Sequence, residues 1–196
     1  MIKVLRQYNP WWRNPSAIKD ESKPQKRLAY YEAIKMIKHN TIRRFVVLSG
    51  ARRVGKTTIM YQMIEQLLDE GVSPKNIIYI SFDNPIVKPI DVETVLSIYE
   101  SLYPIEGIKY IFFDEIQYTE HWELWMKVIY DKRKDIRLTA TGSASPVLEK
   151  GATDSGTGRW CVLKIPTMSF YEYCELIGVD KPVLPENLKI SSLLYK

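Results

Sequence analysis

The sequence predicts an α/β fold, with a parallel sheet covered by helices on both faces. Short apolar runs alternate with segments whose apolar residues recur at helical spacing, and this alternation favours a parallel sheet with right-handed crossovers. Two polar features follow such runs: a glycine-containing stretch at residues 50–57, and the adjacent acids Asp114 and Glu115. Ligands bind at the carboxyl ends of parallel strands, so these features also predict where a site lies. The 196 residues are enough for one core.

The elements are expected in the following order. Residues 1–24 contain prolines and tryptophans and are expected to be irregular. A helix is expected over about residues 24–39, with an apolar surface formed by Leu28, Tyr31, Ile34, Met36 and Ile37. Further strands are expected at 43–48, 76–82, 108–115, 135–141 and 159–165, and further helices at 56–70, 91–102 and 169–177, with a loop at 151–158. The helix at 56–70 is expected to stop at Gly71. Another helix, with Thr119 as its N-cap, is expected between the strands at 108–115 and 135–141, and its apolar stripe is formed by Trp122, Trp125, Met126, Ile129 and Tyr130.

Residues 50–57 fit the pattern G-x-x-x-x-G-K-[ST], the phosphate-binding P-loop, and lie between a predicted strand and a predicted helix. Gly50 and Gly55 permit a tight loop whose N–H groups face a phosphate at the positive end of the helix. Lys56 is expected to reach the β- and γ-phosphates, and the Thr57 hydroxyl to ligate Mg²⁺. The nucleotide-binding residues expected are Gly50, Ala51, Arg52, Arg53, Val54, Gly55, Lys56, Thr57 and Thr58. Arg52 and Arg53 contact phosphate or a neighbouring subunit, or are solvated loop charges.

The acids at the end of the 108–115 strand narrow the chemistry to ATP hydrolysis. An Asp in this position holds Mg²⁺ in P-loop enzymes, so Asp114 takes that role. Glu115 is suited to orient and deprotonate an attacking water. The Asn-Lys-x-Asp segment with which a GTPase reads guanine does not occur, and an arginine-rich kinase lid is not evident, although a small-molecule kinase stays an alternative.

The net charge of +5 is concentrated at the amino terminus, where residues 1–27 hold seven basic and two acidic residues. Tyr8, Trp11 and Trp12 lie among these charges. Basic residues interleaved with aromatics can track a phosphate backbone and stack bases, which would make the chain a nucleotide-gated nucleic-acid-binding module. They can also form an arm that buries its indoles against the core, and we favour the arm.

Other classes of protein are disfavoured by composition. No apolar run approaches the length of a membrane span, and the amino terminus lacks the apolar core of a signal peptide. Cys161 and Cys174 are too few for a disulfide framework and are expected to be reduced, packed thiols, which favours a cytoplasmic location.

The chain resembles the AAA+ P-loop ATPases, and more narrowly a group of archaeal and bacterial predicted ATPases. The segments that carry the resemblance are GARRVGKTT at 50–58, YISFDNP at 79–85, YIFFDEIQ at 110–117, TGSAS at 141–145, and GRW with PTMSFYEY at 158–173. The resemblance implies a three-layer P-loop NTPase sandwich with strand order 5-1-4-3-2. It also implies a polar sensor of the γ-phosphate at the end of the fourth strand, which matches Thr141 or Ser143, with Ser143 favoured.

Two further roles follow from the resemblance alone. Arg159 matches a Gly-Arg element and would bring a cation to a phosphate in its own site or in a neighbour's within a homo-oligomer, or it is a surface arginine. Gln117 would orient water or relay the nucleotide state.

Family members carry a helical lid after the core, whereas this sequence stops at Lys196. The expected organisation is therefore an amino-terminal arm at 1–24, an ATPase core at 25–177, and a tail or the start of a missing lid at 178–196. The expected activity is ATP hydrolysis, slowed if the lid is missing, coupled to a DNA or protein client.

Overall fold

A parallel five-stranded sheet forms the centre of the computed structural model, which describes residues 1–39, 41–103, 105–143 and 158–180. The strands lie in the order β2-β3-β4-β1-β5, which confirms the expected order 5-1-4-3-2 counted from the opposite edge. Their bounds are Phe45–Gly50 (β1), Ile77–Ser81 (β2), Lys109–Asp114 (β3), Ile136–Ser143 (β4) and Trp160–Lys164 (β5). β4 runs two residues beyond its predicted end, because Gly142 and Ser143 pair with the last residues of β1.

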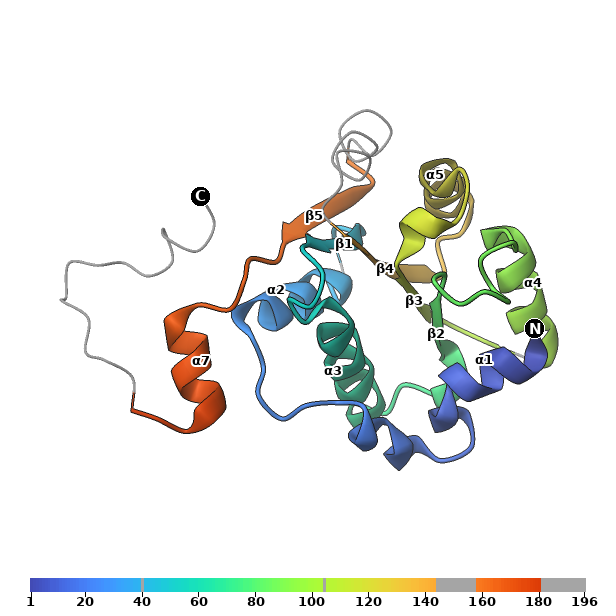
Figure 1. Cartoon of the computed structure of the whole chain (residues 1–196). Helices are drawn as coiled ribbons and strands as arrows, with labels where there is room; N and C mark the ends of the chain where they lie inside the picture. The colour runs from blue at the N-terminus through green and yellow to red at the C-terminus, as the bar shows by residue number, and fades with distance from the viewer. Residues whose placement is uncertain (40, 104, 144–157, 181–196) are drawn as a thin grey trace.

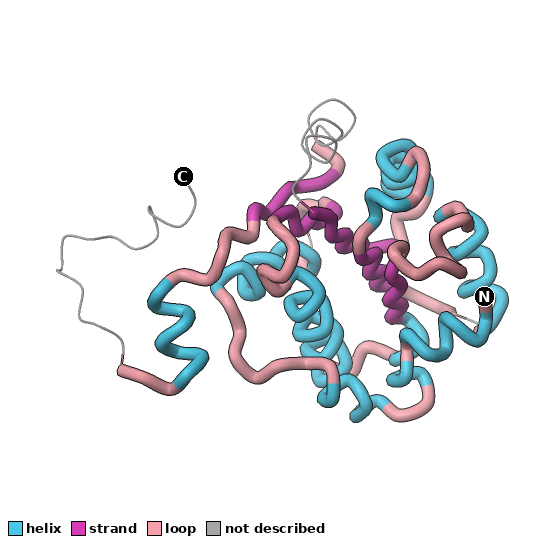
Figure 2. Tube along the Cα trace, in the orientation of Figure 1, coloured by secondary structure: helices cyan, strands magenta, loops and turns pink. Residues whose placement is uncertain are grey.

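Helices cover both faces of the sheet, as predicted (Figures 1 and 2). Helices α2 (Leu28–Ile37) and α3 (Lys56–Asp69) lie on one face, and α4 (Val92–Leu102) and α5 (Trp122–Lys132) lie on the other. A short helix, α7 (Phe170–Ile177), follows β5. Side chains on β1 and β2 are buried throughout, as expected for parallel strands covered on both faces.

The helix expected at 56–70 is confirmed, with one apolar face in the core, whereas the apolar surface expected for α2 is correct at Ile34, Met36 and Ile37 but wrong at Leu28 and Tyr31. In α3, Ile59, Met60, Met63, Ile64 and Leu67 are all buried, and Gly71 with a φ of +85° ends the helix. In α2 the buried residues are Ala29, Tyr30, Ala33 and Ile37. Leu28 and Tyr31 instead face solvent, at 46% and 56% exposure. A search for large apolar residues overlooks the small Ala29 and Ala33, which are buried.

The prediction that residues 1–24 are irregular is wrong. They form helix α1 (Ile2–Tyr8) and two 3₁₀ turns, η1 (Pro10–Trp12) and η2 (Pro15–Asp20). The expectation that the indoles are buried is confirmed, since Trp11 and Trp12 both lie in the core. Their Nε1 atoms donate to the Ile77 carbonyl at 3.2 and 2.8 Å. These contacts place the segment along the outer edge of β2, where α1 also lies (Figure 1).

The prediction that Thr119 caps α5 is also wrong. Thr119 ends a 3₁₀ turn, η4 (Ile116–Tyr118), and α5 begins after His121, whose φ is +54°. The apolar stripe of α5 is confirmed at Trp122, Met126 and Ile129, which are buried, while Trp125 and Tyr130 are partly buried. Residues 151–157 of the loop expected at 151–158, and residues 181–196 of the expected tail, lie outside the described residues. Within the described part, no helix has the length and apolar character needed to cross a membrane.

Candidate functional site

The glycine-containing loop joins β1 to α3 and has two residues with a left-handed backbone. Gly55 has a φ of +90° and caps α3, and Arg53 also lies in the left-handed region, at +66°. The first N–H groups of α3 have no carbonyl partners within the helix, so they are available to an anion. The Lys56 ammonium folds back and donates to the carbonyl oxygens of Gly50 and Ala51 at 3.0 and 2.9 Å. The loop thus holds its lysine, which is buried, directly over the cradle.

Gly50 is required for a different reason from the one that the sequence suggests. A Cβ at this position would clash with the Ile165 carbonyl oxygen, because the two atoms would be closer than van der Waals contact allows. It would also lie 3.1 Å from Val54 Cγ2. Ile165 lies this close because its N–H donates to the Ser49 carbonyl at 2.6 Å. The demand for glycine therefore comes from the chain that leaves β5, and not from a positive φ.

Asp114 forms the centre of a buried cluster of hydroxyl groups. Its Oδ2 accepts from Thr57 Oγ1 and from the Tyr79 hydroxyl, both at 2.8 Å. Its Oδ1 accepts a short hydrogen bond from Thr141 Oγ1. The structure thus brings together Thr57 of α3 and Asp114 of β3, the two residues that the sequence predicts as metal ligands. A carboxylate and a hydroxyl are hard oxygen donors of the kind that Mg²⁺ prefers, so the residues present fit that ion.

Glu115 follows Asp114 and turns away from the strand with a φ of +50°. Its N–H donates to Thr141 Oγ1 at 2.9 Å, and its carboxylate accepts a short hydrogen bond from Gln117 Nε2. Thr141 therefore contacts both acids, whereas the Ser143 side chain lies outside what the structure describes. Gln117 thus holds the Glu115 side chain, whereas its expected parts, to orient water or to relay the nucleotide state, stay predictions.

Two of the predicted arginines lie at the loop, and a third does not. Arg52 is exposed and donates to the Tyr118 hydroxyl at 2.8 Å, and Arg53 is exposed as well. Arg159 precedes β5, and its carbonyl accepts from the N–H of Phe45, the first residue of β1. The loop lies at the other end of β1, about 16 Å away at the rise of a parallel strand. Arg159 pairs there with Asp131 at 3.0 Å, so the structure does not bring it to the phosphate loop of its own chain.

Arg27 is a residue of the site that the sequence reading missed. Its guanidinium donates to the Val54 carbonyl of the loop at 2.7 Å and to the Pro166 carbonyl after β5 at 3.1 Å. It also forms a two-pronged pair with Glu172 of α7, at 2.9 and 3.0 Å. Burial raises the pKa of Glu172, but bonds from Arg27 and the Ser169 backbone more than offset this and hold it below its usual value. Nothing in the local sequence around Arg27 distinguishes it from the other basic residues of the segment.

A cavity of about 340 Å³ lies beside the loop. Its walls come from the segment before α2, from the loop and the first turns of α3, and from the chain around α7. The residues that form these walls are Lys23, Gln25, Arg27, Ala51, Arg52, Arg53, Val54, Gly55, Thr58, Ile59, Gln62, Thr167, Met168 and Leu176. The predicted nucleotide residue Thr58 thus faces this cavity, and Arg27 joins its walls to one another.

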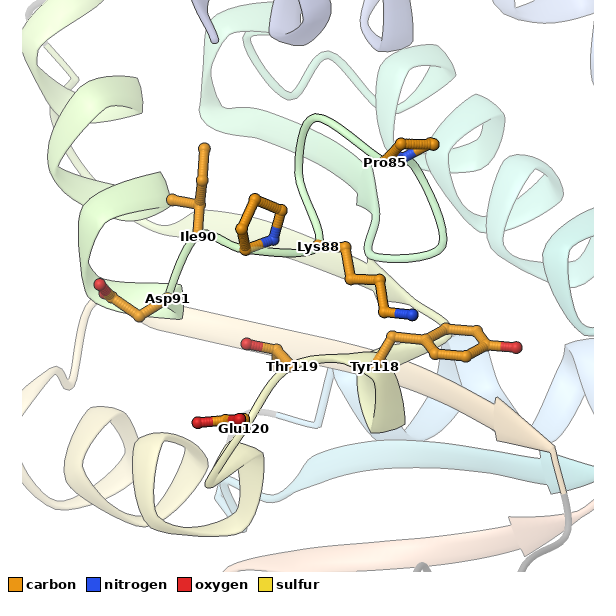
Figure 3. A pocket seen from close by; sticks show the side chains of 8 residues that line it. Pro85, Lys88, Ile90, Asp91, Tyr118, Thr119 and Glu120 are labelled. Carbon is orange, nitrogen blue, oxygen red and sulfur yellow. The ribbon is translucent and has the colours of Figure 1, made fainter.

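A second cavity, of about 640 Å³, opens between the β2–α4 connection and η4 (Figure 3). Lys88 extends over the Tyr118 ring, with its Nζ 5.1 Å from the ring centre. Tyr118 also accepts the bond from Arg52, so this cavity adjoins the phosphate loop through one side chain. The residues of the hydroxyl cluster around Asp114 are not among its walls, which are completed by Pro85, Pro89, Ile90, Asp91, Thr119 and Glu120.

Comparison with known proteins agrees with this geometry. A family model described as an AAA domain matches residues 42–174. The chain belongs to this AAA-domain family. An uncharacterized protein of Methanocaldococcus jannaschii is 29% identical over 188 residues, which are 92% of this chain and 37% of the relative. An uncharacterized protein of Haemophilus influenzae is 28% identical over 138 residues, which are 68% of this chain and 34% of the relative.

This AAA domain therefore spans about a third of the length of the curated relatives that it matches. Among solved structures, the closed state of Hsp104 with ATPγS and FITC casein superposes with a TM-score of 0.55. The match covers 84% of this chain and 31% of that one, at 12% identity. At this identity the likeness concerns the fold alone.

Proposed function

We propose that this AAA domain binds ATP with Mg²⁺ and hydrolyses it, and that the nucleotide state is passed to a macromolecular client, DNA or protein. The observation that carries the proposal is the 2.8 Å bond between Thr57 and Asp114, with Lys56 held over the same loop. These groups come from two elements that are 57 residues apart in sequence. A bound Mg²⁺ would supply charge neutralisation at the phosphates.

The chain's own residues account for the other steps. The loop N–H groups bind phosphate, and Lys56 exchanges its bonds to the carbonyls of Gly50 and Ala51 for bonds to phosphate oxygens. Glu115, held by Gln117, accepts a proton from an attacking water. The cavity of about 340 Å³ beside the loop is the space that we assign to the base and ribose.

A nucleic-acid-binding module is the weaker alternative. The rings of Trp11 and Trp12, which would stack bases, are buried, and their Nε1 atoms already have partners on β2. That alternative therefore rests only on the basic residues of the amino-terminal segment. Salt-sensitive DNA binding that weakens when these basic residues are replaced would favour it.

Cys161 and Cys174 are free thiols, which supports a cytoplasmic location.

Titration with a fluorescent ATP analogue, with Mg²⁺ and in EDTA, tests the proposal together with a phosphate-release assay. We expect Lys56→Ala to lower nucleotide affinity about a hundredfold, because a charged hydrogen bond contributes about 3 kcal/mol. Lys109→Ala is the matched control: it removes another buried lysine, but at the amino ends of the strands, and should leave affinity unchanged. Equal affinities for Lys56→Ala and the wild type would refute the assignment.

A further inference from the structure

The proposed phosphate chemistry does not involve residues 9–12. Three side chains of this segment, those of Asn9, Trp11 and Trp12, nevertheless form hydrogen bonds with the backbone of β2. Asn9 is buried, and its amide bonds both backbone groups of one residue: Nδ2 donates to the Tyr79 carbonyl at 2.8 Å, and the Tyr79 N–H donates to Oδ1 at 2.6 Å. Both indoles donate to the Ile77 carbonyl. These bonds take the place of a neighbouring strand along the edge of β2.

Tyr79, whose backbone Asn9 holds, contacts the candidate metal site with its own side chain. Tyr79 lies two residues before Ser81, which pairs with Asp114, so Tyr79 and Asp114 lie on the same face of the sheet. The Tyr79 hydroxyl donates to Asp114 Oδ2 at 2.8 Å. Its ring packs edge-on against that of Tyr8 in α1, with the ring centres 5.7 Å apart, and lies tilted against that of Tyr61 in α3 at 4.9 Å. Contacts with α1 and α3 therefore fix the direction of this hydroxyl.

The donors around Asp114 differ in what they can do when a cation binds. Thr57 belongs to the phosphate loop, and as a metal ligand it turns a lone pair toward the cation and gives up its bond to Asp114. Tyr79 lies on β2, away from the loop, and can keep its bond to Oδ2. Hydrogen bonds of this kind orient a ligating carboxylate, and their loss typically lowers metal affinity about 10- to 100-fold.

We propose that Tyr79 is a positioning residue for the Asp114 carboxylate, and that Asn9 sets Tyr79 from the edge of the sheet. The amino-terminal segment then adjusts the affinity of the site for its divalent cation. This inference rests on the proposed function, in which Asp114 serves that cation. It gives Asn9 and Tyr79 a part in the chemistry of the cation site, although Asn9 lies outside the sheet, at the edge of β2.

Two phenylalanine variants test the inference against a matched control. Tyr79→Phe and Tyr99→Phe each remove one buried hydroxyl and keep the ring. The Tyr99 hydroxyl donates to the Lys75 carbonyl at 2.6 Å, on the chain that leads into β2, away from Asp114. We expect the Mg²⁺ concentration that gives half-maximal binding of a fluorescent ADP analogue to rise about tenfold in Tyr79→Phe and to stay unchanged in Tyr99→Phe. Affinity for the analogue in EDTA should be the same in both variants and the wild type.

A second pair of variants tests the link to the amino-terminal segment. Asn9→Ala removes both bonds to Tyr79 and should raise the Mg²⁺ requirement in the same direction, by less than Tyr79→Phe. Tyr8→Phe loses only the bond from Asn84 Nδ2, at 3.1 Å, keeps the ring contact with Tyr79, and should behave as the wild type. Thermal unfolding of each variant shows whether it is folded at the assay temperature.

The outcomes separate the two proposals. If Mg²⁺ does not strengthen nucleotide binding by the wild-type protein, the proposed function is contradicted and this inference with it. If Mg²⁺ strengthens wild-type binding and Tyr79→Phe has the Mg²⁺ dependence of Tyr99→Phe, only this inference is overturned. A rise in the Mg²⁺ requirement of both Tyr79→Phe and Asn9→Ala supports both of its steps.

Discussion

The Thr57 hydroxyl donates to the Asp114 carboxylate at 2.8 Å, across the gap between the first turn of α3 and the end of β3. This bond joins the two groups that a divalent cation would bind, and it ties the helix to the strand while the carboxylate is buried. The bond must change when the cation enters, which makes the metal dependence of nucleotide binding the most direct property to measure.

We expect Asp114→Asn to remove the strengthening of nucleotide binding by Mg²⁺ while keeping affinity in EDTA near that of the wild type. The amide has nearly the shape of the carboxylate but lacks the charge that holds a hard cation. Fluorescent ADP binding with and without Mg²⁺ measures this. Asp131→Asn removes an acid near the amino end of β5 and serves as the control. An undiminished Mg²⁺ effect in Asp114→Asn would place the cation elsewhere.

Glu115→Gln should keep ATP affinity and lower the rate of hydrolysis by about 10²- to 10⁴-fold, the contribution typical of a general base. Acid-quenched single turnovers, with protein in excess over ATP, count the ATP that has been cleaved and so separate this effect from product release. Glu120→Gln alters an exposed acid on the rim of the neighbouring cavity and should hydrolyse ATP at the wild-type rate. Wild-type turnover by Glu115→Gln would show that another group takes the proton.

Gly50→Ala should lower the free energy of unfolding by about 1–3 kcal/mol, the usual cost of forcing a methyl group into a packed position. In this loop the obstacle is the Ile165 carbonyl, which the Ser49 bond keeps in place. Because the Gly50 carbonyl also accepts from Lys56, nucleotide affinity should fall as well. Urea unfolding and analogue binding measure the two effects. Gly71→Ala, at a positive φ in open space, should lower stability alone.

Arg27→Ala should lower the free energy of unfolding by about 2–3 kcal/mol and loosen α7. The change leaves the mostly buried Glu172 carboxylate without its cation, which is costlier than the loss of an exposed pair. Hydrogen exchange of residues 166–177 measures the loosening directly. In Lys38→Ala, which breaks the exposed pair with Glu70, the loss should stay below about 1 kcal/mol. Unchanged exchange at α7 in Arg27→Ala would argue against the bridge.

A cluster of Glu100, Lys109, Arg133 and Asp135 should make stability fall in acid. Hydrogen bonds from Arg133 hold the pKa of Asp135 below its usual value. Its stabilisation is therefore fully present above the unfolded pKa of about 3.9 and is lost as the pH falls toward the lower folded value. We expect Asp135→Asn to cost about 1 kcal/mol at pH 7, because the group is partly exposed, and the difference from the wild type to shrink below about pH 4.

Urea unfolding from pH 7 to pH 3 measures this effect, with the exposed Asp20→Asn as a control for the loss of one charge. The cluster lies at the amino ends of the strands, so nucleotide affinity at pH 7 should not change in Asp135→Asn. A difference in stability between Asp135→Asn and the wild type that grows in acid would contradict a lowered pKa of Asp135 in the folded protein.

The convergence of Lys56, Thr57 and Asp114 could be predicted because each is placed by a local rule. A loop pattern between strand and helix fixes the first two, and a strand that ends in an acid fixes the third. The alternation of elements predicted the sheet, and the resemblance predicted its order. Thr141 was one of two hydroxyls that fitted the end of β4, and only the register of β4 against β3 brings its side chain to Asp114.

Other residues could not be found in this way, because their roles depend on contacts between distant segments. In the sequence Tyr79 is not distinguishable from any other strand residue. Its hydrogen bond to Asp114 follows from the pairing of β2 with β3. Arg27 meets Val54 and Glu172 only after β5 returns beside β1. Arg159 is the opposite case: the resemblance suggested a phosphate contact in its own site or in a neighbour's, or a surface arginine, and the direction of β5 places it at the other end of the sheet from the loop of its own chain.

The bonds that Asn9, Trp11 and Trp12 make with β2 have a consequence for assembly. An open edge strand is adhesive, because its free N–H and C=O groups can recruit a strand from another molecule. Side chains of the same polypeptide already occupy these groups at Ile77 and Tyr79, so β2 cannot extend the sheet there. If this domain joins another chain by strand addition, the contact has to form on the β5 side.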